Sequence, residues 1–127
     1  MAKPQSVTVS AFVDTSATIE TGICHGQAGE YKLSSVTMVP FAALAESGAN
    51  KYVIAFQQGS DTVATSYDTS TTGNALAAQT SKAVTVSTSA GPALEFGATD
   101  VLKITATKTG TANLKVQVVC AFEAVRV

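Results

Sequence analysis

His25, the single histidine of the chain, stands between Cys24 and a glycine-containing stretch that ends at Glu30. A histidine beside a thiol and an acid could bind a metal ion or form a nucleophile–base pair. A structural zinc site needs four ligands, and no further ligands follow at the required spacing. We therefore interpret His25 as a loop residue at the rim of the fold, and we predict neither a metal ion nor a cofactor.

Two other patterns could have carried chemistry. Asp61 and Asp68 flank a predicted strand, so we interpret them as turn residues and not as a carboxylate pair. The glycines of residues 26–29 (GQAG) lack the lysine and the following helix of a phosphate-binding loop. With no nucleophile–base couple in the sequence, we predict that the protein is not an enzyme.

The composition narrows the choice of partners. The chain has 127 residues, 46% of them hydrophobic but only 13% charged, and serine and threonine together occupy 30 positions. Globular proteins usually carry about 25% charged residues. The net charge is −1 and no basic run occurs, which argues against a nucleic-acid partner. No apolar run approaches the roughly 20 residues of a membrane helix, and residues 1–5 show no apolar leader segment. A neutral, hydroxyl-rich surface suits contact with another protein.

Hydrophobic residues alternate with polar ones along most of the chain, which is typical of half-buried strands. The pattern predicts about eight strands, over residues 6–13, 18–24, 31–39, 51–57, 62–67, 82–88, 93–96 and 100–127, the last range being a two-stranded hairpin. We predict an all-β antiparallel sandwich over residues 6–127, jelly-roll-like, preceded by a flexible N-terminal arm of residues 1–5. An immunoglobulin-like sandwich is the alternative, although it usually buries a tryptophan and this chain has none.

Several local features are predicted within this frame. Tyr31 to Val39 changes phase near Ser34-Ser35, which indicates a β-bulge. Phe41 to Glu46 has the composition of a short helix. Val63, Thr65 and Tyr67 are expected on one inward face. The hydrophobic residues of Asp68 to Ser81 show no period, and this segment is expected to be a contact loop or a mobile one. Phe12 is either a second core contact or an exposed apolar residue. Cys24 and Cys120 are either two buried hydrophobic residues or a disulfide.

A resemblance to a known family covers about residues 31–120. It rests on the order of SSVTMVP, FAALAESGANKY, VIAFQQGSDTVATSY, KAVTVSTS and LEFGATDVLKITATKTGTANLKVQVV. This order resembles the head decoration (cement) proteins of tailed bacteriophages, of the jelly-roll type. The step Asp100-Val101-Leu102 before Thr107-Lys108-Thr109-Gly110-Thr111 is the most similar part.

The resemblance implies a structural virion protein that binds the major capsid protein on the outer surface of the head and stabilises the shell. It further implies a homo-oligomer, commonly a trimer, and assembly in the host cytoplasm. The alternatives are a tail, baseplate or fibre module, a carbohydrate-binding β-sandwich, or a coat protein that forms its own shell. A sugar site usually presents exposed aromatic rings, whereas the three tyrosines here are expected to point inward.

If the protein builds interfaces, its contact residues should come from the arm and from loops at one end of the sandwich. Phe41 is the best candidate for an apolar anchor, with core packing of its own short helix as the equal alternative. The full set of candidate contacts is Lys3, Pro4, Gln5, Phe41, Leu44, Asn50, Thr71, Asn74, Leu76, Gln79 and Arg126.

Overall fold

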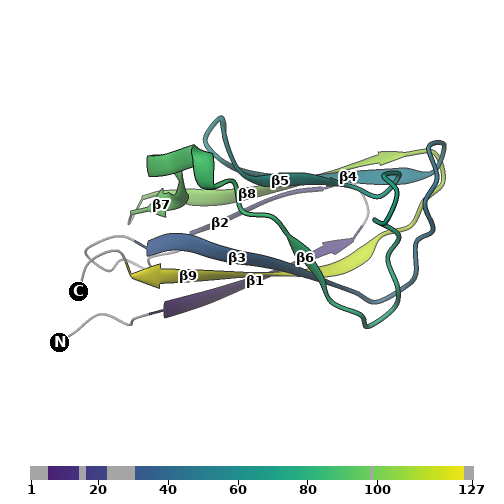
Figure 1. Cartoon of the computed structure of the whole chain (residues 1–127), viewed down its shortest axis with the longest axis horizontal. Helices are drawn as coiled ribbons and strands as arrows, with labels where there is room; N and C mark the ends of the chain where they lie inside the picture. Colours follow the sequence, from purple (N-terminus) through teal and green to yellow (C-terminus); the bar gives the residue numbers. More distant parts are fainter. Residues whose placement is uncertain (1–5, 15–16, 23–30, 98, 125–127) are drawn as a thin grey trace.

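The computed structural model describes residues 6–14, 17–22, 31–97 and 99–124. These residues form two antiparallel sheets that face each other across one core (Figure 1). The first sheet has the order β1 (Ser6–Asp14), β9 (Lys115–Ala124), β3 (Tyr31–Pro40) and β6 (Lys82–Val84), and β7 (Glu95–Phe96) also pairs with β3. The second has the order β2 (Ala17–Gly22), β8 (Val101–Thr109), β4 (Lys51–Gln58) and β5 (Asp61–Asp68). A 3₁₀ helix, η1 (Thr88–Leu94), precedes β7.

The strand pairs are nested one inside another. β1 pairs with β9, β2 with β8, β3 with β6 and β4 with β5, so the two halves of the chain run back along each other. Rolling such a nested hairpin into two facing sheets produces a jelly roll. The predicted all-β antiparallel sandwich is therefore confirmed, and its strand order is that of a jelly roll.

Alternate side chains of both sheets fill the space between them. Tyr52, Ile54 and Phe56 of β4 are fully buried, as the alternation predicts. Phe96 and Phe122 meet edge to face with ring centroids 5.3 Å apart, an arrangement that aromatic rings favour. The other buried apolar side chains of β9 are Val116, Val118 and Cys120.

Cys120 is a free thiol in this core. Burial raises its pKa to about 12, so the thiol is neutral near pH 7 and behaves as a small hydrophobic side chain. Cys24, the other half of the suggested disulfide, lies outside the described residues. His25 and Glu30 lie outside them as well.

The predicted bulge in β3 is present. The pairing of β3 with β9 changes register between Leu33 and Ser35, and Leu33 and Val36 are both buried although they stand three positions apart. The Ser34 hydroxyl donates to the carbonyl of Ala121 at 3.0 Å beside the irregularity. The extra residue returns both halves of the strand to the same face of the sheet.

The predicted terminal hairpin is wrong. β8 lies between β2 and β4 in one sheet, and β9 lies between β1 and β3 in the other. The segment between them crosses from one sheet to the opposite one. Two strands that face each other across a core bury alternate residues just as a hairpin does, so the period of two does not distinguish these arrangements.

The predicted helix at residues 41–46 is also absent. Leu44 instead forms an isolated bridge with Leu76, in which the Leu44 N–H donates to the Leu76 carbonyl at 2.9 Å and the Leu76 N–H returns a bond at 2.8 Å. Helix propensity is a weak preference, and six residues are too few for a helix that is stable by itself. The tertiary bridge therefore determines the local structure.

β5 departs from the predicted alternation. Val63 and Ala64 are both buried, whereas Thr65 is exposed, contrary to the expected inward position. The register with β4 is irregular around Phe56, and the Thr65 N–H turns outward to donate to the Thr85 carbonyl at 2.8 Å. The irregularity lets β5 bond to the segment after β6.

That segment joins the two sheets at one side. The predicted strand 82–88 is shorter than expected, because β6 ends at Val84. Val86 then forms an isolated bridge with Ala64 of the second sheet, and the Ser87 N–H donates to the Val63 carbonyl at 2.9 Å. Backbone hydrogen bonds thus connect the sheets at their β5 and β6 edges.

Candidate interaction surface

Two of the segments predicted to make contacts come together at one end of the sandwich. Segments 41–50 and 69–81 lie side by side there, at the right of Figure 1. The Gln79 N–H donates to the Pro40 carbonyl at 2.7 Å, and the Gly73 N–H donates to the Glu46 carboxylate at 2.8 Å. Together with the Leu44–Leu76 bridge, these bonds make the two segments one surface, which we call the loop end.

Polar contacts hold segment 69–81 in place at its start. The Asp68 carboxylate accepts from the N–H and the hydroxyl of Ser70, at 2.9 and 2.6 Å, and forms an ion pair with Lys51 at 3.4 Å. The hydrogen bonds from Ser70 and then the Lys51 ammonium lower the pKa of Asp68. The Tyr67 hydroxyl donates to the Asn74 carbonyl at 3.0 Å. Although the segment has no regular structure, its backbone is fixed by specific partners.

The candidate contacts are divided between surface and interior. Phe41, Thr71 and Gln79 are exposed, whereas Leu44, Asn50 and Asn74 are half-buried. Leu76 is only 4% exposed and belongs to the core, so its side chain leaves the set of contacts. It is buried because its bridge to Leu44 pulls the loop over the open end of the sandwich. Lys3, Pro4, Gln5 and Arg126 lie outside the described residues.

Asn50 has an internal role. Its side-chain oxygen accepts from the N–H and the hydroxyl of Thr111, at 2.8 and 3.0 Å. This residue therefore ties the start of β4 to the crossing between β8 and β9. The half-buried Asn74 is similar, because its amide donates to the Asp68 carbonyl at 3.0 Å. Sequence reasoning placed both residues in the correct loops but did not find these partners.

The loop end is nearly free of charge and rich in small side chains. Glu46 is the single charged residue in segments 41–50 and 69–81. Alanine loses no rotamer freedom when it is covered, so a partner can bury this surface at a small cost in conformational entropy. The exposed alanines are Ala42, Ala43, Ala45, Ala49, Ala75, Ala77 and Ala78.

Two exposed aromatic rings, Phe41 of the loop end and Phe12 of β1, contact each other. Phe12 is 48% and Phe41 is 49% exposed, and their ring centroids lie 5.4 Å apart. Phe41 points outward because the preceding Pro40 points inward, and its N–H donates to the Lys115 carbonyl at 2.8 Å. Of the two alternatives for Phe41, packing within its own helix is therefore excluded. Phe12 is exposed, which is one of the two alternatives given for it. The sequence indicated this position, because Phe12 is out of phase with Val13 and the other inward residues of β1.

The loop end and the start of β1 lie at opposite ends of the sandwich (Figure 1). Ser6, the first residue of β1, is paired with Glu123, whereas Asp14 at its other end is paired with Lys115 next to the loop end. A strand of this length spans about 27 Å. A partner that touches both the loop end and the start of β1 must cover that distance.

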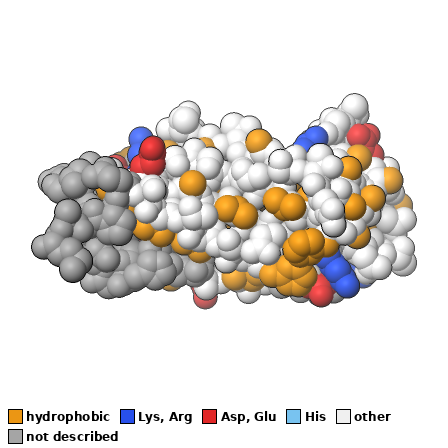
Figure 2. Space-filling model, turned by 90° about the horizontal axis from the view of Figure 1, so that it is seen from below, with side chains coloured by type: hydrophobic (Ala, Val, Ile, Leu, Met, Phe, Trp, Pro, Cys, Tyr) orange, Lys and Arg blue, Asp and Glu red, His pale blue; other side chains and the backbone are white. Residues whose placement is uncertain are grey.

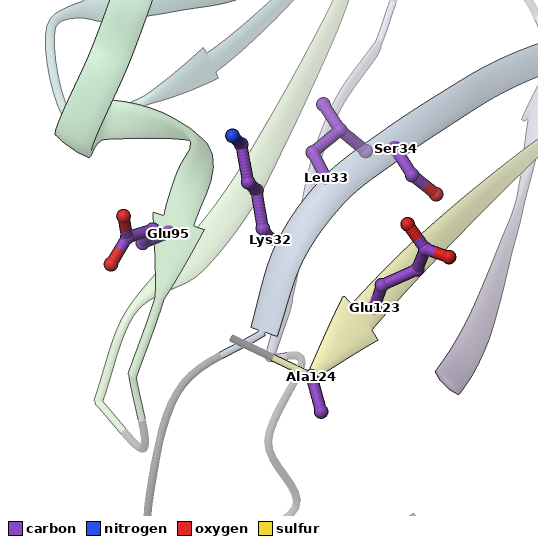
Figure 3. A pocket seen from close by; sticks show the side chains of 6 residues that line it. All are labelled: Lys32, Leu33, Ser34, Glu95, Glu123 and Ala124. Atoms are coloured by element: carbon purple, nitrogen blue, oxygen red, sulfur yellow. The ribbon is translucent and has the colours of Figure 1, made fainter. Parts of the chain in front are cut away.

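A cavity of about 390 Å³ lies at the end of the sandwich away from the loop end (Figure 3). Lys32 is in register with Glu95 on one side and with Glu123 on the other, and the two carboxylates do not converge on one point. Leu33, Ser34 and Ala124 complete the lining. Among the described residues, no group of three or more His, Cys, Asp or Glu side chains is placed to hold a metal ion. Opposite charges on neighbouring strands stabilise a sheet, and this accounts for Lys32, Glu95 and Glu123 without a role in binding.

Comparisons with known proteins give a low structural similarity. No family model matches the chain, and no curated protein matches it. Among solved structures, the chain is similar to one titled "Cyanophage Pam1 capsid asymmetric unit", with 14% sequence identity and a TM-score of 0.49. The similarity covers 97% of this chain and 91% of that one. At this identity and TM-score it supports no conclusion about function.

In the described part of the chain, no helix is both long and apolar enough to cross a membrane.

Proposed function

We propose that this protein is a structural component of a bacteriophage virion, a decoration (cement) protein that binds the major capsid protein on the outer surface of the head and stabilises the shell. The observation that carries the proposal is the nested pairing of β1 with β9 through β4 with β5. This topology is the jelly roll, which viral capsid domains use and which the sequence resemblance implied. The protein would occupy the capsid surface of particles assembled in the host cytoplasm.

The character of the loop end supports a role in protein contact. It is uncharged apart from Glu46, many of its exposed side chains are alanines, and its backbone is held by the Leu44–Leu76 bridge. A fixed surface loses little entropy when a partner covers it. Many copies bound to one lattice gain further from avidity if neighbouring copies also touch.

The aromatic residues do not favour the carbohydrate-binding alternative. Tyr31 and Tyr52 are fully buried and Tyr67 is 5% exposed, so no tyrosine offers a ring face to a sugar. Phe12 and Phe41, the exposed aromatic residues, contact each other. A sugar site usually combines an open ring with polar groups placed around it.

A tail, baseplate or fibre module stays as the alternative proposal, and immunogold labelling of virions would distinguish head from tail.

The experiment is to purify shells that lack the protein, add it back, and measure binding and resistance to heat. We expect it to bind and to raise the temperature at which shells break. Ala45→Arg and Ala77→Arg place a large charge on the loop end and should weaken binding roughly tenfold or more. Ser60→Arg, in the exposed β4–β5 turn at the opposite end, is the matched control. Shells that neither bind the protein nor gain heat resistance would contradict the proposal.

A further inference from the structure

The outer face of the first sheet carries the two largest exposed hydrophobic side chains of the described residues. Phe12 on β1 and Phe41 just after β3 reach across β9 to contact each other. Val39 and Gln117 lie beside them on the same face and are half-buried. Figure 2 shows hydrophobic side chains along this face, most densely at its lower right, beside one basic and one acidic group.

Two opposite charges adjoin this aromatic pair. Asp14 of β1 and Lys115 of β9 are exposed and directly opposite in register. Asp14 follows Phe12 by two positions on β1, and Lys115 precedes Gln117 by two positions on β9. Residues two apart in a strand point to the same side, so all four side chains project from the same face. Because both side chains are exposed, a second molecule can reach both charges. We call Phe12, Asp14, Val39, Phe41, Lys115 and Gln117 the aromatic patch.

We propose that the aromatic patch binds a second copy of this chain. In a two-fold arrangement with its axis parallel to the strands, between β1 and β9, the two sheets pack face to face. Asp14 of each copy then lies opposite Lys115 of the other, and the two pairs of phenylalanines cover each other. A two-fold interface requires a surface that is complementary to itself, and an aromatic centre flanked by one acid and one base meets that requirement.

The face is small for a protein–protein interface. Three strands about 30 Å long and about 4.8 Å apart cover roughly 450 Å² in projection. Stable complexes usually bury about 800 Å² per partner. We therefore expect a reversible dimer that forms as the concentration rises, and that weakens in high salt because exposed charges are screened.

This inference goes beyond the proposed function and does not depend on it, because the purified protein alone tests it. It also differs from the homotrimer that the sequence resemblance implies. A homotrimer uses two different patches on each chain, whereas a two-fold interface uses one patch twice.

The first test is sedimentation equilibrium of the free protein over a range of concentrations. We expect the mass to rise from one chain to two, and Phe12→Thr with Phe41→Ser to weaken the dimer roughly tenfold or more. Val101→Ser is the matched control, since Val101 is 37% exposed on the second sheet, and it should leave the dimer unchanged. Melting curves should show that all variants are folded. A trimer, a monomer at every concentration, or a dimer that survives the double substitution would overturn the proposal.

The second test exchanges the charges. Asp14→Lys and Lys115→Asp should each prevent self-association, because each places like charges opposite one another. When the two variants are mixed, the new lysine of the Asp14→Lys chain faces the new aspartate of the Lys115→Asp chain, and the mixed dimer should form. A chain with both substitutions should pair with itself again. If the mixture stays monomeric while wild type dimerises, the proposed two-fold arrangement is wrong.

Discussion

At the scale of single residues, Gly110 is the most tightly constrained of the glycines whose surroundings the structure describes. It lies in the crossing from β8 to β9, with φ at 73°. A Cβ atom there would overlap the carbonyl oxygen of Ala49 and the side-chain oxygen of Asn50. Asn50 is the residue that bonds to Thr111 next to the glycine. Conformation and space both require glycine at this position.

Gly110→Ala should therefore lower the free energy of unfolding by roughly 2–4 kcal/mol, from backbone strain together with the displaced Ala49–Asn50 segment. Gly59→Ala is the matched control, because Gly59 has φ at 61° but nothing within 4 Å of an added Cβ. It should cost only about 1 kcal/mol, which is the strain alone. Urea denaturation followed by circular dichroism measures both values. Equal losses in the two variants would show that the contact with Ala49 is unimportant.

At the scale of elements, the loop end depends on one bridge between two irregular segments. Leu76 places its side chain in the core, while its backbone pairs with Leu44. Segment 69–81 is thereby held over the end of the sandwich, although its sequence has no hydrophobic period. A single buried side chain and two backbone hydrogen bonds replace the regular pairing of a strand.

Leu76→Ala should lower the free energy of unfolding by about 2–4 kcal/mol, because it leaves a cavity in the core. Leu44→Ala should cost less, roughly 1 kcal/mol, because Leu44 is half-buried and water can enter the space it leaves. Hydrogen exchange should show faster exchange at the Leu44 and Leu76 amides in the Leu76 variant before the β4 amides change. A variant with wild-type exchange at both amides would show that the side chain does not hold the loop.

At the scale of the whole molecule, the nested pairing makes the first and last strands neighbours. Ser6 is paired with Glu123 and Asp14 with Lys115, so β1 cannot pair until the end of the chain is in place. Contacts between residues far apart in sequence slow folding, because the loop must close before the contact stabilises it.

We therefore expect refolding from urea to take milliseconds to seconds, as in other sandwiches dominated by distant pairing. Stopped-flow tyrosine fluorescence can follow it, since the buried Tyr31, Tyr52 and Tyr67 change environment on folding. Val13→Ala, at a fully buried site in β1, should mainly speed unfolding and leave the refolding rate nearly unchanged, because β1 docks late. Slower refolding in this variant would show that β1 is part of the folding nucleus.

The sequence by itself determined where most of the strands lie and, along regular strands such as β4, which side chains enter the core. Tyr52, Ile54 and Phe56 lie inside as predicted, and the change of phase at the bulge between Leu33 and Ser35 is also where the alternation placed it. Both depend on the period of two, which is a property of the local backbone. Phe41 was proposed from the sequence as an apolar anchor, and its ring is exposed.

Only the tertiary structure decided what each of these elements lies against. It placed β8 and β9 in opposite sheets, turned the expected helix into a bridge from Leu44 to Leu76, and brought Phe12 to Phe41. The physical reason is the same in all three cases. Alternation records which face of a strand avoids water but not which strand covers that face, because burial is non-directional and any apolar surface of suitable shape satisfies it. The partner is selected by the packing of the whole chain, and the aromatic patch on the outer face exists only after that packing is complete.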